Sequence, residues 1–416
     1  MTALVRPRRQ TGLRREQHPA NYTILVAVVA LAAIGILMVY SSSAMKAYVT
    51  WDDPFKVVGP QLVWALLGIV TMVVMMRLDY RYLRLVSVPL YAIALVLLVL
   101  VLVPGFGIRV GGSARWLQIG PLPAIHPAEF AKLALVVYLA HWFARRGTGL
   151  SGFRRGTLPF VVIFGPVLLL VLREPDLGTS AVIGLTALAM FFVAGANLVH
   201  LAAMASAGLA LVVLVVSRTP YQLERVRAFL DPWSDPQGSG FHTIQGLLAL
   251  GLGGLFGAGL GGSRSAGGLF LPNASNDFIF AIIGEEFGLI GAGVVIALFC
   301  LLAWHGVRTA LGAPDTFGAL LAGGITAWLC IQAFINIGVV VSLLPITGIT
   351  LPFISAGGSS LIISFAAVGI LLSVSRETVE LGTWNDAPAD RGRGHGRARL
   401  PGPRRRPIAP RATGRA

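Results

Sequence analysis

Charged residues are scarce in this sequence. Only 12% of its 416 residues are Asp, Glu, Lys or Arg, whereas 55% are hydrophobic. A soluble domain usually carries about 25% charged residues, so most of this chain has no water-facing surface. The shortage of charge argues against an ordinary soluble fold and predicts an all-α integral membrane protein.

Cysteine and cofactor motifs are also nearly absent. The two cysteines, Cys300 and Cys330, fall in apolar stretches and are interpreted as small core residues rather than a disulfide. The histidines lack the spacing of a zinc site, and no Walker, GxSxG or dinucleotide-binding motif occurs in a suitable context. These absences argue against ATP-driven pumping by the chain alone, assign no cofactor and leave any metal site unknown.

The net charge of +15 does not indicate nucleic-acid binding, because the basic residues gather at the chain ends and in short connecting loops. Residues 1–21 and 376–416 lack apolar periodicity and are predicted to be disordered basic tails. Such arms suit an anionic inner leaflet, with partner binding as the alternative. No cleavable signal peptide is evident, and the apolar run at 22–41 is interpreted as a first span.

Apolar runs predict about ten transmembrane helices in a membrane domain at 22–375. The loops richest in Lys and Arg fall on the same side as both tails, and the positive-inside rule makes that side cytoplasmic. An even number of spans then places both termini in the cytoplasm. The helices are expected at 22–42, 57–76, 83–103, 128–144, 158–172, 178–195, 199–217, 278–304, 316–344 and 358–375.

Two long extracytoplasmic loops are predicted, at 104–127 and 218–276. Loops of this length in a compact domain are usually functional or flexible. The second is rich in glycine, and the spacings Gly253/Gly257 and Gly257/Gly261 permit close backbone packing. The stretch 244–260 is therefore either a re-entrant or interfacial helix or a flexible loop.

Ionisable residues at membrane depth are costly and indicate functional sites. Glu129 and Lys132, three residues apart in HPAEFAKL, are predicted to pair, either as a purely structural pair or as the lining of a polar cavity. Asp277, at the start of the eighth expected helix, is either a helix cap or a functional carboxylate. Partial burial is expected to raise its pKa toward a value that suits a general base.

Further charges accompany these. Arg173, Glu174 and Asp176 lie in REPDLGTS, where Asp176 is expected to cap the next helix. Capping does not explain three charges in so short a connection. Glu285 and Glu286, about two turns inside the eighth helix, are expected to pair with Arg or Lys or to line a polar cavity.

Arg115 and Trp116 lie in the first long loop, where Trp116 fits the interfacial aromatic belt and Arg115 could contact lipid phosphate. A simple membrane anchor is the alternative. Taken together, the outer-side charges suit a lipid-linked anionic substrate that reacts just outside the bilayer. A transporter stays open, because intramembrane charges also mark ion pathways.

Six motifs occur in order across nearly the whole membrane domain: MVYSSSA (38–44), ARWLQIGPLPAIHPAEFAKL (114–133), REPDLGTS (173–180), FLDPWSDPQGSGFHTIQ (229–245), LPNASNDFIFAIIGEEFGLIG (271–291) and INIGVVVSLLPITGITLPFISAGGSS (335–360). On these motifs the chain resembles the SEDS family (shape, elongation, division and sporulation proteins). It is more similar to the cell-division branch than to the rod-elongation branch.

The resemblance implies a SEDS-type fold in the bacterial cytoplasmic membrane, at the division septum. It implies polymerisation of lipid II, the undecaprenyl-diphosphate-linked precursor, beside a class B penicillin-binding protein transpeptidase and other membrane proteins of the divisome. The family's essential aspartate falls on Asp277. The residues expected to bind substrate are Glu129, Lys132, Arg115, Trp116, Arg173, Asp176, His242 and Gln245.

The implied reaction is an inverting glycosyl transfer. The 4-hydroxyl of GlcNAc on one lipid II attacks the anomeric carbon of MurNAc on the growing strand, and Asp277 accepts the proton as general base. Negative charge builds on the diphosphate, so cations are expected to stabilise it. Lys132, Arg115 and Arg173 are the candidates, with a divalent cation as a further possibility.

The chain departs from the family pattern at four places. His126 stands where Gln is usual, Asn273 where many members have Glu, and Ala356 where Tyr is common, while Arg264 lies in a segment that lacks the usual Gln-Lys. Asp277 is retained, so activity is expected, whereas donor-site details transfer less directly. The alternatives are a rod-elongation polymerase, a lipid II flippase or other transporter, and a non-enzymatic division scaffold.

Overall fold

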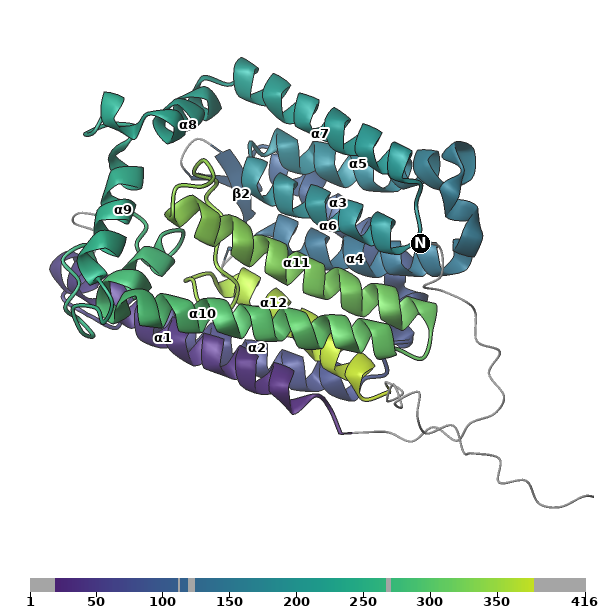
Figure 1. Cartoon of the computed structure of the whole chain (residues 1–416), viewed down its shortest axis with the longest axis horizontal. Helices are drawn as coiled ribbons and strands as arrows, with labels where there is room; N and C mark the ends of the chain where they lie inside the picture. The colour runs from purple at the N-terminus through teal and green to yellow at the C-terminus, as the bar shows by residue number, and fades with distance from the viewer. Residues whose placement is uncertain (1–18, 111–112, 119–123, 267–270, 378–416) are drawn as a thin grey trace, which may run out of the picture. The chain divides into compact units, whose positions relative to one another are not determined.

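The computed structural model describes residues 19–110, 113–118, 124–266 and 271–377. Nearly all of both predicted basic tails lies outside these ranges. Within them, every expected span corresponds to a helix (Figure 1). These ten helices are α1 (Tyr22–Trp51), α2 (Val58–Arg77), α3 (Tyr82–Leu102), α4 (Pro127–Arg146), α5 (Leu158–Arg173), α6 (Leu177–Val193), α7 (Leu198–Arg218), α10 (Ile279–Gly312), α11 (Thr316–Val340) and α12 (Gly358–Ser375).

Apolar composition makes most of these helices membrane spans. Eight of the described helical segments are long and apolar enough to cross a bilayer by length and composition: α1, α2, α3, α5 with the turn before it, α7, α10, α11 and α12. Of the other two, α6 is apolar but only 17 residues long. The second, α4, carries the charged side chains of Glu129 and Lys132 within its first two turns.

Polar side chains set several helix starts. Asn21, Asp176 and Asp315 each accept a hydrogen bond from a backbone N–H in the first turn of α1, α6 and α11, which satisfies donors that a helix cannot pair internally. Pro127 opens α4, where its missing N–H costs nothing. Local sequence therefore fixes where these spans begin.

Shorter elements connect the spans. A two-stranded antiparallel hairpin, β1 (Gly107–Val110) and β2 (Ser113–Leu117), follows α3. The long loop after α7 folds into α8 (Pro220–Leu230), η3 (Pro232–Ser234) and α9 (Phe241–Gly253), and two short turns, η1 (Gly147–Ser151) and η2 (Phe153–Thr157), join α4 to α5. The end of the helix bundle that carries the hairpin, α8 and α9 is called the hairpin end below.

Helix α10 is broken at Gly288, whose φ of 65° and ψ of −165° are not helical. The freed backbone groups pair with the glycine-rich segment: Ala258 N donates to Glu285 O at 2.9 Å, and Leu289 N donates to Gly254 O at 2.9 Å. A Cβ at Gly253 would lie 1.9 Å from Gly284 O. Within the stretch 244–260, α9 thus continues to Gly253, and the residues after it are not helical and are hydrogen-bonded to α10.

The interior of the bundle is built around α11, which contacts α4, α6, α10 and α12. Figure 1 shows α10, α11 and α12 side by side. Two carboxamides on α11, Gln332 and Asn336, are fully buried. They are four residues apart and therefore share one helix face, which is directed at the functional site.

Candidate active site

Asp277 lies in the turn immediately before α10, at the hairpin end, and is half-buried. Its backbone is fixed from two sides. Asn336 Nδ2 donates to Asp277 O at 2.9 Å and to Ile349 O at 2.7 Å. Ser355 Oγ donates to Asn276 O at 2.7 Å. The carboxylate is therefore presented by a turn that α11 and the segment before α12 hold in place.

Gly348 leaves space beside this carboxylate. A Cβ at this glycine would lie 3.5 Å from Asp277 Oδ2 and 3.9 Å from Arg115 Nη1, and its φ of +75° is a conformation that other residues rarely adopt. The carboxylate of Asp277 and the guanidinium of Arg115 thus both border the same glycine. A carboxylate that could accept a proton and a cation that could bind an anionic group therefore lie close together.

The electrostatic environment of Asp277 suits a base. Burial raises the pKa of Asp277 to about 6, against the lowering effect of Arg225 and Arg115, and nearby Asp176 raises it further. Near neutral pH the group is mostly ionised yet still basic enough to accept a proton. A pKa close to the working pH is what general-base catalysis favours.

Arg225, on α8, was not among the predicted site residues. Its guanidinium donates to Ile346 O at 3.2 Å and lies 4.4 Å from the centre of the Tyr221 ring. The one sequence signal is a basic residue in the second long loop, and nothing in the local pattern distinguishes Arg225 from Arg227. Only the fold brings Arg225 to Asp277.

A second group of side chains surrounds Asp176, which is buried and caps α6 as predicted. Its Oδ2 lies 3.8 Å from Arg115 Nε and 3.7 Å from His126 Nε2. Arg115 Nη2 also donates to Pro175 O at 2.6 Å, and the Trp116 and His126 rings meet edge to face, 5.3 Å apart. The predicted residues Arg115, Trp116 and Asp176 therefore come together, although Asp176 follows Trp116 by 60 positions in the sequence.

Glu174, next to this group, is fully buried, and neither of its carboxyl oxygens has a hydrogen-bond partner among the described residues. Burial raises its pKa to about 9, Asp176 adds to the rise, and Arg115 opposes it. Glu174 is accordingly a neutral acid at pH 7. The charge at this connection thus resides on Asp176 and Arg115.

Glu129 and Lys132 form the predicted pair, with Lys132 Nζ 2.8 Å from Glu129 Oε1 and both side chains buried. Lys132 also donates to Gln332 Oε1 at 2.6 Å, and Ser360 Oγ donates to Glu129 Oε2 at 3.0 Å. The pair thus joins α4 to α11 and α12. A buried pair with its remaining polar atoms bonded avoids most of the cost of burying charge.

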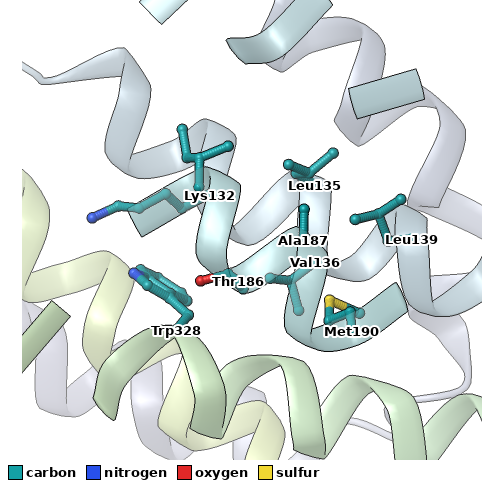
Figure 2. Close-up of a pocket in the computed structure, with 9 residues that line it drawn as sticks. Lys132, Leu135, Val136, Leu139, Thr186, Ala187, Met190 and Trp328 are labelled. Atoms are coloured by element: carbon teal, nitrogen blue, oxygen red, sulfur yellow. The ribbon is translucent and has the colours of Figure 1, made fainter. Parts of the chain in front are cut away.

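The small cavity beside Lys132 has a volume of about 10 Å³, room for about one water molecule. Figure 2 shows Lys132, Trp328 and Thr186 on one side of it and Leu139 and Met190 on the other. The ammonium lies 5.2 Å from the Trp328 ring centre. A cavity this small cannot admit a lipid-linked sugar, so any substrate contact of Lys132 is made on the side of Glu129.

The remaining predicted residues are His242, Gln245 and Arg173. His242 lies beside the turn that bears Asp277, its ring 6.1 Å from that of Phe278, and Gln245 is half-buried one turn later on α9. Arg173 is exposed at the end of α5 and has no ion pair or hydrogen bond among the described residues. Nothing in the described residues brings Arg173 to the others.

Glu285 and Glu286 are buried but have no basic partner in the described part of the chain. Glu285 accepts from Ser263 Oγ at 2.5 Å and from Arg264 N at 2.8 Å, and Glu286 accepts from Ser41. The expected pairing with Arg or Lys is therefore wrong. Hydroxyl and backbone donors take that place and hold the glycine-rich loop against α10.

No group of three or more His, Cys, Asp or Glu side chains in the described ranges is arranged to hold a metal ion. Positive charge near Asp277 is instead supplied by Arg115 and Arg225. Both guanidinium groups lower the pKa of Asp277. A phosphate or diphosphate group placed there would meet two permanently charged fork-shaped donors.

Comparison with known proteins identifies the family of the chain. The chain is 45% identical to stage V sporulation protein E of Bacillus subtilis over 85% of its length and 96% of that protein. It is 43% identical to the probable peptidoglycan glycosyltransferase FtsW of Geobacter sulfurreducens, covering 85% of this chain and 95% of that protein.

Two solved structures share the fold. One, described as showing structural coordination of polymerization and crosslinking by a peptidoglycan synthase complex, matches with a TM-score of 0.70 and 31% identity over 86% of this chain and 98% of that chain. The rod shape determining protein RodA of Thermus thermophilus matches with a TM-score of 0.62 and 29% identity over 86% and 97%. The profile of the cell cycle protein family that comprises FtsW, RodA and SpoVE spans residues 22–380, and the chain belongs to that family.

Proposed function

We propose that this chain polymerises lipid II into glycan strands with Asp277 as general base, and that it does so at the division septum as FtsW-type proteins do. Membership in a family whose relatives are peptidoglycan glycosyltransferases makes the chain a peptidoglycan polymerase. The single observation that carries the proposed mechanism is the placement of Asp277. It is a half-buried carboxylate with a raised pKa that, like Arg115, lies next to Gly348.

The chemistry asks for one base and several cations. A sugar hydroxyl is a poor nucleophile at neutral pH, and a positioned base that takes its proton contributes about 10²–10⁴-fold. The bond from the anomeric carbon of MurNAc to the diphosphate breaks as the bond to the GlcNAc 4-oxygen forms, and the proton goes to Asp277. Attack from the face opposite the leaving group inverts the anomeric centre. Undecaprenyl diphosphate is a good leaving group without protonation, so a second carboxylic acid is not needed, unlike in glycoside hydrolysis.

The leaving group is undecaprenyl diphosphate, on which negative charge builds. Arg115 and Arg225 support its stabilisation, because both act electrostatically on Asp277 and both carry rigid bidentate donors. Lys132 and Asp176 contribute to stabilising the leaving group only indirectly. Lys132 is held in the buried pair with Glu129, and Asp176 orients the Arg115 guanidinium. Arg173 has the least support of the predicted cations, since it is exposed and uncontacted in the described structure.

Orientation and partner follow from charge and from the structural relative. The basic tails and loops favour cytoplasmic termini, which would place Asp277 at the outer face of the bacterial cytoplasmic membrane. The synthase complex that this fold resembles couples polymerization to crosslinking. We therefore propose a class B penicillin-binding protein transpeptidase as partner, within the divisome. A rod-elongation role is the alternative biological setting.

The test is polymerisation of purified lipid II by the full chain together with its transpeptidase partner. Asp277→Asn preserves size and is expected to reduce strand synthesis by about 10²–10⁴-fold while the protein elutes and melts like the wild type. Asp235→Asn, in the turn before α9, is the matched control, because that carboxylate bonds only local groups of its own turn among the described residues. Full polymerisation by Asp277→Asn would remove the residue from the mechanism, and lipid transfer between leaflets without strand synthesis would favour a flippase.

A further inference from the structure

A second polar cavity lies at the opposite end of the bundle from Asp277. It has a volume of about 380 Å³ and is formed where α3 begins, α4 ends and α11 begins. The proposed polymerisation at the hairpin end does not use it. Its lining residues are Arg84, His141, Ala144, Arg145, Asp315, Thr316 and Phe317.

The charges around this cavity are not balanced. Asp315 is engaged by Arg84 at 2.6 Å and by Arg81 at 3.3 Å, and Arg81 also pairs with Glu377 at 2.7 Å. Arg145 is exposed and has no ion pair among the described residues. Arg81 is further paired with Asp79 at 3.8 Å. Among the residues that line the cavity, the guanidinium groups of Arg84 and Arg145 face the single carboxylate of Asp315, and the surplus positive charge lies on Arg145.

The Asp315 carboxylate in the cavity is already bound by donors of the protein itself. Although burial opposes ionisation, hydrogen bonds from Gly318 N and Tyr80, together with the two arginines, hold the pKa of Asp315 below its usual range. Asp315 therefore stays ionised and neutralises Arg81 and Arg84 only in part. Arg84 retains a buried Nε that has no partner among the described residues, while its guanidinium lies 4.8 Å from the centre of the Phe317 ring.

The position of the cavity matches the headgroup layer of a bilayer. It lies at the ends of membrane-spanning helices, where Trp142 stacks with Arg146 at 5.3 Å and Trp304 with Arg308 at 4.9 Å. Tryptophan gathers at the membrane–water interface. Basic pockets between helices at this depth bind anionic lipid headgroups.

We propose that this cavity, defined by Arg84, His141, Arg145 and Phe317, binds the phosphate of an anionic phospholipid headgroup. Arg145 supplies an unpaired guanidinium from the end of α4, and Arg84 supplies donors that Asp315 does not use. His141 also lines the cavity, and its Nδ1 is hydrogen-bonded to the Ser87 hydroxyl. Phe317 is fully buried behind the cavity and packs against the Arg84 guanidinium.

The test compares two neighbouring arginines in the full-length purified chain. Arg145 lines the cavity, whereas Arg146 stacks on Trp142 and donates to Arg155 O, away from it. Binding of phosphatidylglycerol is titrated by native mass spectrometry, with phosphatidylcholine as the uncharged comparison. Arg145→Gln is expected to weaken the first phosphatidylglycerol by about fivefold, whereas Arg146→Gln leaves it within about twofold and neither changes phosphatidylcholine.

A separate arm distinguishes the source of the phosphate. Inorganic phosphate and glycerol phosphate are titrated by calorimetry against the same variants. Binding of these soluble ions that depends on Arg145, without a matching effect on phosphatidylglycerol, keeps the phosphate site but overturns the lipid as its occupant. Equal losses from Arg145→Gln and Arg146→Gln, or no loss from either, overturn the site itself. Because Arg145 has no described ion pair, its replacement leaves the Asp315 cluster intact.

Discussion

Helices α7 and α11 are both apolar enough to cross a membrane, yet α7 lies at the surface of the bundle and α11 in its interior. An 18-residue segment of α7 has a mean hydropathy of 2.4, and no residue of α7 is buried. The corresponding segment of α11 has a mean hydropathy of 1.7, and 67% of that segment is buried. Neighbours of α7 are chiefly α6 and α8, while α11 is enclosed by four spans. Hydropathy separates lipid-compatible segments from soluble ones, but the less hydrophobic helix is the interior one.

The reason is that polar side chains of α11 hydrogen-bond to residues of the functional site. Gln332 accepts from Lys132 and Trp328 and donates to Thr350 O at 3.0 Å. Asn336 holds the backbone of Asp277. On α7, by contrast, His200 bonds Thr157 at 2.9 Å near one end, and the other polar residues are Ser206 and the last two, Ser217 and Arg218. A lipid-facing helix needs only apolar surface, whereas an interior helix must satisfy the polar groups of a site.

The buried pair that α11 supports gives the largest expected stability effect. Lys132→Met leaves the Glu129 carboxylate buried and unpaired, which is expected to destabilise the protein by about 3–5 kcal/mol, read as a lowered midpoint of thermal unfolding in detergent. The double variant Glu129→Gln/Lys132→Met is expected to recover most of that stability but not polymerisation. Recovery of both would make the pair purely structural. Lys56→Met, at an exposed position, is the control.

A leucine on each helix tests the comparison directly. Leu329 on α11 is fully buried, and Leu209 on α7 is 66% exposed. Leu329→Ala is expected to cost about 2–5 kcal/mol through lost packing and a cavity, whereas Leu209→Ala stays within about 0.5 kcal/mol. Unfolding in the same detergent measures both. Equal losses would mean that α7 packs against protein in a way that the described structure does not contain.

The Asp277 turn that α11 holds predicts a pH dependence. The ionised carboxylate is the active form, and its pKa is raised to about 6. Polymerisation is therefore expected to be nearly constant above pH 7 and to fall about tenfold per unit well below pH 6. Initial rates of strand synthesis between pH 4.5 and 8 check this. A rate that stays flat down to pH 4.5 contradicts a base with a raised pKa.

Glu174 is expected to have the smallest effect on polymerisation, while its effect on stability grows with pH. Its pKa in the folded protein is about 9, above the ordinary value of 4.5, so its contribution to stability is full below pH 4.5 and is lost as the pH rises toward 9. Glu174→Gln mimics the neutral acid. Its melting temperature should match the wild type near pH 5 and exceed it increasingly up to pH 9, with polymerisation at pH 7 unchanged. A gap that shrinks with pH would show that Glu174 is ionised in the fold.

The sequence was sufficient for the spans and for much of the site. Long apolar runs located all ten helices, and the i, i+3 spacing of Glu129 and Lys132 correctly predicted a pair, because both signals are local. Asp176 was correctly predicted as a helix cap for the same reason. Family motifs supplied Asp277, whose role stays a proposal.

What the sequence could not supply depends on contacts between distant segments. Arg225 reaches the site only because α8 folds back from α7, and the β1–β2 hairpin that presents Arg115 has no clear alternating pattern. Glu285 was expected to pair with Arg or Lys or to line a polar cavity, yet serine and backbone donors 20 to 22 residues earlier bind its carboxylate. Which of two apolar helices is enclosed is likewise decided by packing, not by hydropathy.

The break in α10 has a practical consequence for where a spectroscopic label can be attached to this protein. Because backbone atoms, not side chains, join residues 254–259 to α10, a probe attached at Gly253 or Gly257 would push that contact apart. Gly251, on the same helix as Gly253, has no atom within 4 Å of an added Cβ. With only Cys300 and Cys330 to remove, a single cysteine at position 251 would place a spectroscopic label beside the break and report on its movement during turnover.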